Sequence, residues 1–142
     1  MPTTGAPARL ASAVSTLYCL PVSLAQGGSG LGALLGEERV RALLEELSRR
    51  FPGVEFTFVG TSEGSVSAYQ AARMNPQLAR RVILTASVFV PTRSGTGLSG
   101  ADWLGFAGKL LWVHHEDDPC EYTAYHYARR FAAASGSPLV TV

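Results

Sequence analysis

Cysteine, lysine and long hydrophobic runs are scarce in this 142-residue chain. Two cysteines, Cys19 and Cys120, are too few for a disulfide scaffold. A single lysine accompanies eleven arginines, which are scattered along a chain of net charge +1, so composition gives no case for nucleic-acid binding. No apolar run reaches the length of about 18 residues that a membrane span needs.

Motifs for cofactors and metals are also missing. The chain has no Walker lysine motif, no paired C-x-x-C and no H-E-x-x-H. Its glycine-rich stretch, Gly27-Gly-Ser-Gly-Leu-Gly32 with Gly36, does not fit the dinucleotide fingerprint G-x-G-x-x-G, because Gly30 is followed by Gly32 and then Gly36. We therefore expect neither a cofactor nor a metal, and we interpret residues 26–36 as a linker.

The most informative stretch is Val54-Glu-Phe-Thr-Phe-Val-Gly-Thr-Ser-Glu-Gly64. An apolar run over 54–59 ends in G-x-S-x-G, and a helix-compatible segment over 64–74 follows at once. This strand–turn–helix context predicts a nucleophile elbow, with Ser62 on a strained turn. Gly60 and Gly64 are expected to remove side chains that would collide where strand and helix approach. The alternative is a glycine-rich turn without chemistry, or one that binds an anion at the helix N-terminus.

Further apolar runs predict strands near 82–89, 110–115 and 139–142, in addition to the one at 54–59. Helices are expected over 37–50, 64–74 and 121–134, with Asn75-Pro76 ending the second. The sequence thus predicts one α/β domain over 37–142, a three-layer sandwich with a parallel sheet and helices on both faces. Glu116, Asp117 and Asp118 follow strand 110–115, on the sheet edge where open α/β folds build their sites.

Together these residues resemble the α/β-hydrolase family from about residue 37 onwards. Gly60-Thr-Ser-Glu-Gly64 looks like the elbow, and Trp112-Val-His-His-Glu-Asp-Asp-Pro119 is similar to the pattern V-x-H-G-x-x-D-P, with His115 where the family often has glycine. The resemblance implies a serine hydrolase acting on a small ester or thioester. Ser62 would be the nucleophile, Asp118 the acid with Asp117 and then Glu116 behind it, and the backbone N–H of Glu63 an oxyanion donor.

The family's catalytic histidine is expected after the last strand, but the chain stops in that strand, at Val142. His114 and His115 precede the acid and alternate between the two sheet faces, and His126 falls in the helix that follows. No second oxyanion donor is assured. We therefore expect a truncated member that is inactive alone, or a non-catalytic binding module on the same scaffold. An exposed edge of strand 54–59 would favour self-association.

Two segments remain open to interpretation. Arg9 is the only charge before Glu37, Leu10–Leu20 is mostly apolar, and Ser23-Leu-Ala25 offers small residues for cleavage. Residues 1–25 therefore resemble a signal peptide of a secreted or periplasmic protein. The rival interpretation makes Val14–Leu20 a strand of a cytoplasmic protein, and an alternative for the glycine-rich stretch is an oxyanion loop similar to those of esterases. Residues 91–108 are expected to form a loop above the site, where three apolar side chains could line a pocket: Trp103, Leu104 and Phe106.

Overall fold

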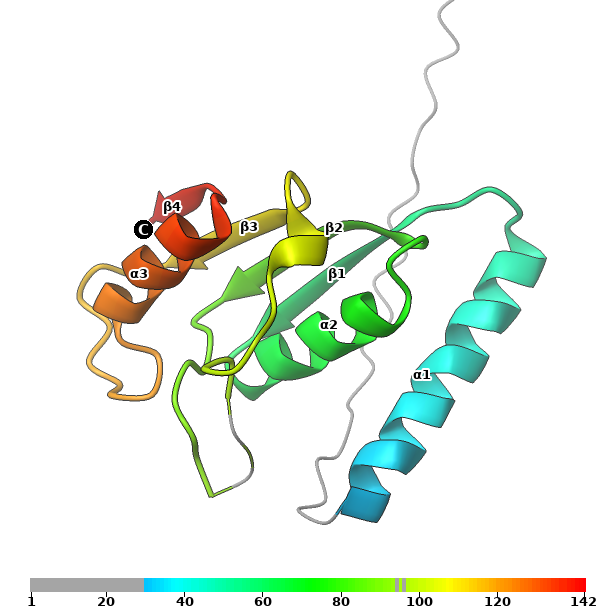
Figure 1. The fold of residues 1–142 in the computed structure, drawn as a ribbon, viewed down its shortest axis with the longest axis horizontal. Coiled ribbons are helices and arrows are strands. Elements are labelled where there is room, and N and C mark those ends of the chain that lie inside the picture. Colours follow the sequence, from blue (N-terminus) through cyan, green and yellow to red (C-terminus); the bar gives the residue numbers. More distant parts are fainter. Residues whose placement is uncertain (1–29, 94, 96) are drawn as a thin grey trace, which may run out of the picture.

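The computed structural model describes residues 30–93, 95 and 97–142. These residues form a parallel sheet with helices beside it (Figure 1). The elements in chain order are α1 (Gly30–Arg50), β1 (Phe56–Thr61), α2 (Glu63–Met74), β2 (Ala79–Thr85), the short 3-10 helix η1 (Leu104–Phe106), β3 (Leu110–His114), α3 (Tyr125–Ser135) and β4 (Leu139–Thr141).

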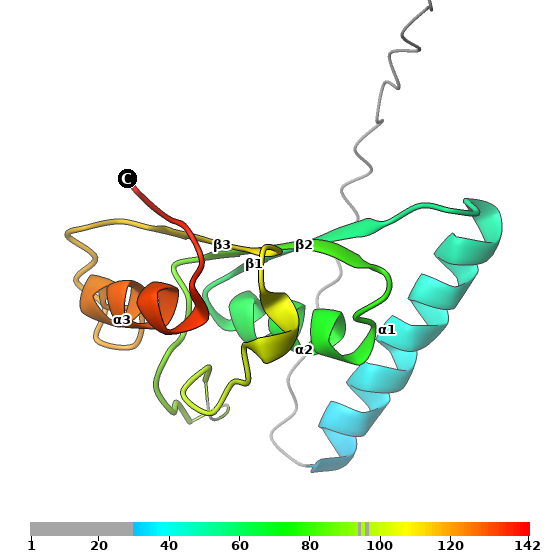
Figure 2. The same cartoon turned by 45° about the horizontal axis from the view of Figure 1, so that its top comes forward.

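The sheet confirms the α/β class and the parallel strand arrangement. Its strand order is β1-β2-β3-β4, and all three pairings are parallel. Right-handed crossovers taken in one direction across a sheet place their helices on one face. Figure 2 accordingly shows α2 and α3 on the same side of the strands, where we had expected helices on both. The described residues thus supply the sheet and one layer of helices.

The main core lies between the sheet and this helical layer. Alternate strand residues point into it, among them the fully buried Val82, Leu84 and Trp112. From the helical side come Ala68 and Ala72 of α2 together with small and aromatic residues of α3. Ala128 and Ala132 of α3 are buried, and Tyr125 and Phe131 pack against the core.

Helix α1 packs against α2 at one end of this layer. Val40 and Leu44 are buried against Ala71, with Phe56 and Phe58 of β1 beside them. The helix begins at Gly30, so the second half of the predicted linker is helical instead. Leu31, Ala33, Leu34 and Leu35 are good helix formers, and their propensity outweighs the cost of about 1 kcal/mol that each interior glycine imposes.

Other element boundaries shift by a few residues from the predicted ones. β2 ends at Thr85 instead of continuing to residue 89, because Ala86 adopts φ 40° and turns the chain out of the sheet. α3 begins at Tyr125 rather than 121, since Thr123 is buried and its hydroxyl donates a hydrogen bond to Asp118 in the preceding loop. Asn75 and Pro76 end α2 as predicted, and Gly136 ends α3 in the left-handed conformation with φ 59°.

β1 forms one edge of the sheet within the described part of the chain. No helix among the described residues is both long enough and apolar enough to cross a membrane. The predicted leader at 1–25 and the strand at Val14–Leu20 both lie outside the described residues.

Candidate functional site

Ser62 occupies the turn between β1 and α2, as G-x-S-x-G predicts. Its backbone has φ 56° and ψ −126°, a conformation that non-glycine residues adopt at a cost of about 1–3 kcal/mol. Its N–H donates to the carbonyl oxygen of Thr85 at 3.1 Å, which ties the turn to the end of β2. Its side chain is exposed, and no hydrogen bond of its hydroxyl is found among the described residues. The turn thus presents an uncommitted hydroxyl at the carboxyl edge of the sheet.

Ser65 holds this turn from beneath. Its hydroxyl, which is fully buried, donates to the carbonyl oxygen of Ser62 at 2.6 Å and accepts from the N–H of Val88 at 3.2 Å. One side chain therefore links the strained serine to the segment that follows β2. Sequence reasoning missed this role, because Ser65 looked like one more small residue on a packed helix.

The two glycines of the motif have different roles. A Cβ atom on Gly60 would lie 2.2 Å from the carbonyl oxygen of Gly64 and 2.8 Å from the Cβ of Ala68, so only glycine fits. A Cβ on Gly64 would meet nothing within 4 Å. The expectation that Gly64 also removes a collision is wrong, because its contribution to the close approach is its backbone carbonyl rather than its missing side chain.

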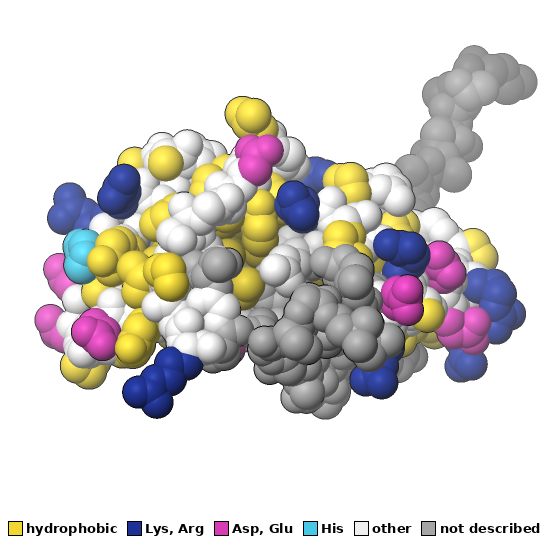
Figure 3. Space-filling model, turned by 60° about the horizontal axis from the view of Figure 1, so that its bottom comes forward, with side chains coloured by type: hydrophobic (Ala, Val, Ile, Leu, Met, Phe, Trp, Pro, Cys, Tyr) yellow, Lys and Arg dark blue, Asp and Glu magenta, His cyan; other side chains and the backbone are white. Residues whose placement is uncertain are grey.

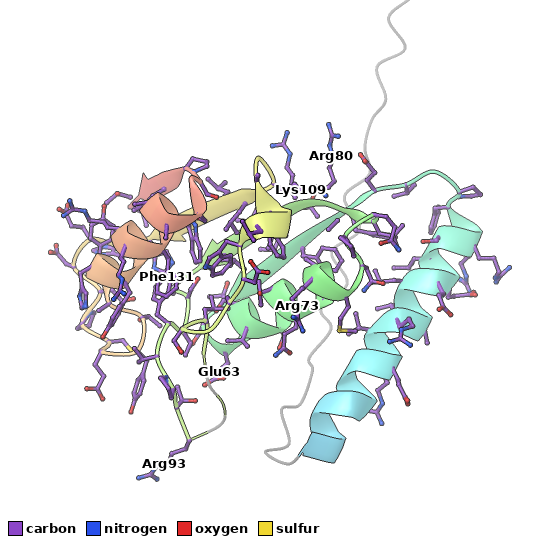
Figure 4. The ribbon with its side chains drawn as sticks, in the orientation of Figure 1. Glu63, Arg73, Arg80, Arg93, Lys109 and Phe131 are labelled. Carbon is purple, nitrogen blue, oxygen red and sulfur yellow. The ribbon has the colours of Figure 1, made fainter. Side chains whose placement is uncertain are left out.

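Glu63 begins α2, where a helix directs its first N–H groups outward from its N-terminus. Its carboxylate oxygen Oε1 accepts from the hydroxyl of Thr92 at 3.2 Å, so the loop after β2 folds back over the elbow. Figure 4 shows Glu63 at this end of α2 with Arg93 beyond it, and Arg80 and Lys109 at the opposite end of the strands. The elbow and the 91–97 loop therefore share the carboxyl edge of the sheet.

Asp118 lies in the loop after β3, on the same carboxyl edge as Ser62 but two strands away. Strands are spaced by about 4.8 Å, so the strand ends are separated by about 10 Å. The carboxylate accepts from the Thr123 hydroxyl at 2.7 Å through Oδ2 and from the Cys120 N–H at 2.9 Å through Oδ1. Burial opposes ionisation of this group, but the two hydrogen bonds and the neighbouring His114 and His115 outweigh it and lower the pKa of Asp118. Asp118 is therefore an anchored carboxylate, held in place by these two hydrogen bonds.

The other two acids of the cluster are exposed. The N–H of Glu116 donates to the carbonyl oxygen of Val142, and that of Asp117 donates to Nδ1 of His115 at 2.9 Å. Figure 3 shows acidic side chains and a histidine gathered at the end of the molecule where α3 and this loop lie. Of the three acids, Asp118 is the one held by side-chain hydrogen bonds.

His114 is buried and contacts a different serine. Its Nε2 lies 3.2 Å from the hydroxyl of Ser87 and accepts from the Ser87 N–H at 3.4 Å, and both residues are essentially inaccessible. Nε2 is therefore the acceptor, which leaves the proton of the neutral ring on Nδ1. Burial lowers the pKa of His114 and outweighs the opposing effects of Asp118 and the Thr123 carbonyl. The Thr123 carbonyl favours the protonated ring, yet Nδ1 has no partner of hydrogen-bond geometry among the described residues.

The other histidines lie outside the elbow. His115 is exposed directly after the end of β3, and His126 is exposed on α3 with its ring centroid 4.0 Å from that of Tyr127. None of the three histidines hydrogen-bonds Ser62. In the sequence Ser87 falls inside the strand predicted near 82–89, and nothing in the pattern paired it with His114.

The three residues predicted to line a pocket differ in their burial. Phe106 is buried, and Trp103 packs in the same aromatic group, with ring centroids 5.0 Å from Tyr69 and 5.1 Å from Trp112. Only Leu104 is open, at 89% exposure. The loop over 91–108 therefore extends the core with two of its three large apolar residues.

The elbow and the anchored carboxylate are the elements of the site that the described residues provide. These residues contain no group of three or more His, Cys, Asp or Glu side chains placed to hold a metal ion. Comparison of the chain with protein-family models, with curated proteins and with solved structures gave no significant match. The case for a function therefore rests on geometry and sequence pattern.

Proposed function

We propose that the chain carries the nucleophile and acid of an α/β-hydrolase-type serine hydrolase for an ester or thioester. Ser62 is the nucleophile, Asp118 is the acid, and the backbone N–H of Glu63 is one oxyanion donor. The observation that carries the proposal is the backbone of Ser62, at φ 56° and ψ −126° between a parallel strand and a helix. Such strain persists where the surroundings over-determine it, which is common at functional sites. Here Gly60, Ser65 and Thr85 provide that support.

The chemistry would follow the usual acyl transfer. The Ser62 oxygen attacks the carbonyl carbon while a base takes the hydroxyl proton, which gives a tetrahedral intermediate. This intermediate collapses as the bond from the carbonyl carbon to the alcohol oxygen or thiol sulfur breaks, and the alcohol or thiol leaves with that proton. Water then attacks the acyl–Ser62 ester, which releases the acid and restores the Ser62 hydroxyl. Asp118 would orient the base. The described histidines do not act as the base for Ser62, because His114 hydrogen-bonds Ser87 and the other two are exposed outside the elbow. The chain alone is therefore expected to be inactive.

Chemical rescue tests this proposal directly. A fluorophosphonate probe should label Ser62 poorly in buffer and clearly when imidazole supplies the missing base, as read by mass spectrometry of the modified peptide. Ser62→Ala should abolish the rescued labelling, and Asp118→Asn should weaken it. Ser137→Ala, a serine on the turn after α3, is the matched control and should leave the labelling unchanged. Labelling that imidazole does not increase, or that survives Ser62→Ala, would overturn the assignment.

A non-catalytic binding module is the second candidate. The observation that favours it is that the buried His114 already hydrogen-bonds another residue: its Nε2 accepts from the Ser87 N–H. If the chain is a binding module, the Ser62 turn is strained but has a structural role only and takes part in no reaction. Ester hydrolysis should then equal that of Ser62→Ala with and without imidazole, whereas the hydrolase proposal requires a difference when imidazole is present.

A further inference from the structure

Residues 86–89, which we call the junction, follow β2 and form neither helix nor strand. Ser87, Val88 and Phe89 are nevertheless buried. Irregular segments usually run over the surface of a protein, because a buried backbone leaves N–H and C=O groups that need partners. The partners of the junction lie on both sides of it, at the Ser62 turn and in the loop that carries Asp118.

On one side the junction holds the Ser62 turn. The N–H of Val88 donates to the hydroxyl of Ser65 at 3.2 Å, and that hydroxyl donates to the carbonyl oxygen of Ser62 at 2.6 Å. The N–H of Ser62 donates to the carbonyl oxygen of Thr85, the residue before the junction, at 3.1 Å. The end of β2 and the chain that follows it therefore hold both backbone polar groups of Ser62, directly or through Ser65.

On the other side the junction holds the loop after β3. The N–H of Phe89 donates to the carbonyl oxygen of Tyr122 at 2.9 Å. The next residue, Thr123, donates its hydroxyl to the carboxylate of Asp118 at 2.7 Å. The contact with the junction and the hydrogen bond to the acid therefore come from neighbouring residues of this loop.

His114 joins the junction to the same loop a second time. Its Nε2 accepts from the Ser87 N–H at 3.4 Å and lies 3.2 Å from the Ser87 hydroxyl. Burial lowers the pKa of the ring, while Asp118 and the carbonyl of Thr123 act in the opposite sense, so both groups lie near the ring. Ser87 and His114 are essentially inaccessible, and bulk water therefore does not compete for their contact.

Two strained turns lie at the ends of neighbouring strands. Ser62, with φ 56°, follows β1, and Ala86, with φ 40°, follows β2. Of the described residues other than glycine, these two alone have positive φ. Such a backbone persists only where its surroundings over-determine it. The hydrogen bonds from Ser62 through Ser65 to Val88 connect the two turns, so each turn supports the other.

We propose that Ser87 and His114 position the Ser62 turn relative to the Asp118 loop. Within the described part of the chain neither of them hydrogen-bonds the nucleophile or the acid, so both are positioning residues. The strand ends that carry Ser62 and Asp118 are about 10 Å apart, and the junction spans that distance. The catalytic meaning of this inference rests on the proposed function, whereas the link itself rests on the hydrogen bonds.

Amide hydrogen exchange tests the link without any chemistry. Ser65→Ala removes the hydroxyl that joins the elbow to the junction. The N–H groups of Cys120 and Thr123, across the junction, should then exchange about tenfold faster relative to Val82, whose sheet amide reports global unfolding. Ser137→Ala, which removes a serine hydroxyl on the turn after α3, is the matched control and should leave these rates unchanged. Unchanged rates in Ser65→Ala would overturn the proposal, since the loss of a merely local contact would affect the elbow alone.

Two substitutions of His114 test the catalytic consequence. Gln places an amide oxygen near the position of Nε2 and can still accept from Ser87, whereas the shorter Asn does not reach it. Labelling of Ser62 by the fluorophosphonate in the presence of imidazole should stay within about twofold of the wild type in His114→Gln and fall about tenfold or more in His114→Asn. The amide spectrum reports whether both proteins are folded. Ser87→Ala, which removes the partner hydroxyl with little change in volume, replaces His114→Asn if that variant does not fold, and it should also slow the labelling.

The outcomes separate this inference from the proposed function. Equal labelling of the Gln and Asn variants, or of Ser87→Ala and the wild type, would overturn the positioning role. If imidazole does not rescue labelling of the wild type, the hydrolase proposal fails, and the exchange rates in Ser65→Ala still decide whether the junction links the elbow to the acidic loop.

Discussion

A Cβ atom on Gly60 would lie 2.2 Å from the carbonyl oxygen of Gly64, and no rearrangement of a flexible side chain can relieve that contact. The elbow therefore depends on one glycine of its motif. We expect Gly60→Ala to lower the free energy of unfolding by about 3 kcal/mol or more, because the added methyl group would collide with backbone atoms. Gly64→Ala should be neutral or stabilising by about 0.5–1 kcal/mol, since it has open space and lies in a helix. Urea denaturation of both variants checks the pair, and equal effects would contradict the geometry.

Ser62 carries a backbone conformation that favours glycine. Ser62→Gly should raise the free energy of unfolding by about 1 kcal/mol, because relief of the strain exceeds the added entropy of the unfolded chain. Ser62→Ala keeps the strained backbone and removes a hydroxyl that makes no hydrogen bond within the described part of the chain, so its stability should match the wild type. Thermal unfolding distinguishes the two, and a Ser62→Gly protein less stable than Ser62→Ala would show that the turn is not strained.

Acid should destabilise the protein through His114. Burial holds its pKa in the folded state below the ordinary value of about 6.5, so the unfolded chain takes up the proton first as the pH falls. The contribution of the neutral His114 ring to the free energy of unfolding is fully present above about pH 6.5 and is lost progressively as the pH falls below that value. Asp118, whose pKa is also lowered, adds a second loss as the pH falls through the range below about 3.9.

Unfolding midpoints measured between pH 8 and pH 5 check the His114 contribution. His114→Gln should flatten the dependence in this range, while His126→Gln, on the exposed face of α3, should leave the wild-type dependence unchanged. A wild-type protein equally stable at both ends of the range would contradict the buried neutral ring.

Tyr69 anchors the 91–108 loop. Its hydroxyl donates to the carbonyl oxygen of Asp102 at 3.0 Å and accepts from the Asp102 N–H at 2.8 Å. Tyr69→Phe leaves both backbone groups without that partner and should cost about 1–3 kcal/mol. Tyr122→Phe, at an exposed ring, is the matched control and should change stability by less than about 0.5 kcal/mol. Faster amide exchange at Asp102 in the Tyr69 variant alone would locate the effect, and equal exchange in both variants would refute the anchor.

Local sequence determined the order and type of the elements. Alternating and continuous apolar runs located the four strands, the glycine–serine motif located the turn at Ser62, and Asn75-Pro76 and Gly136 located two helix ends. These features depend on residues close in the chain, whose conformational preferences act before any tertiary contact forms. The resemblance to α/β-hydrolases rests on the same local motifs and stays a hypothesis.

Tertiary structure decided which of these residues meet. Strand order placed Ser62 and Asp118 on one edge, two strands apart, and it placed all the described helices on one face of the sheet. The pairing of His114 with Ser87, the hydrogen bond from the Ser62 N–H to Thr85 and the link between Ser65 and the Val88 N–H each join a strand end to another segment. No local pattern encodes these pairings, because each depends on the crossover direction and register that bring separate strand ends together.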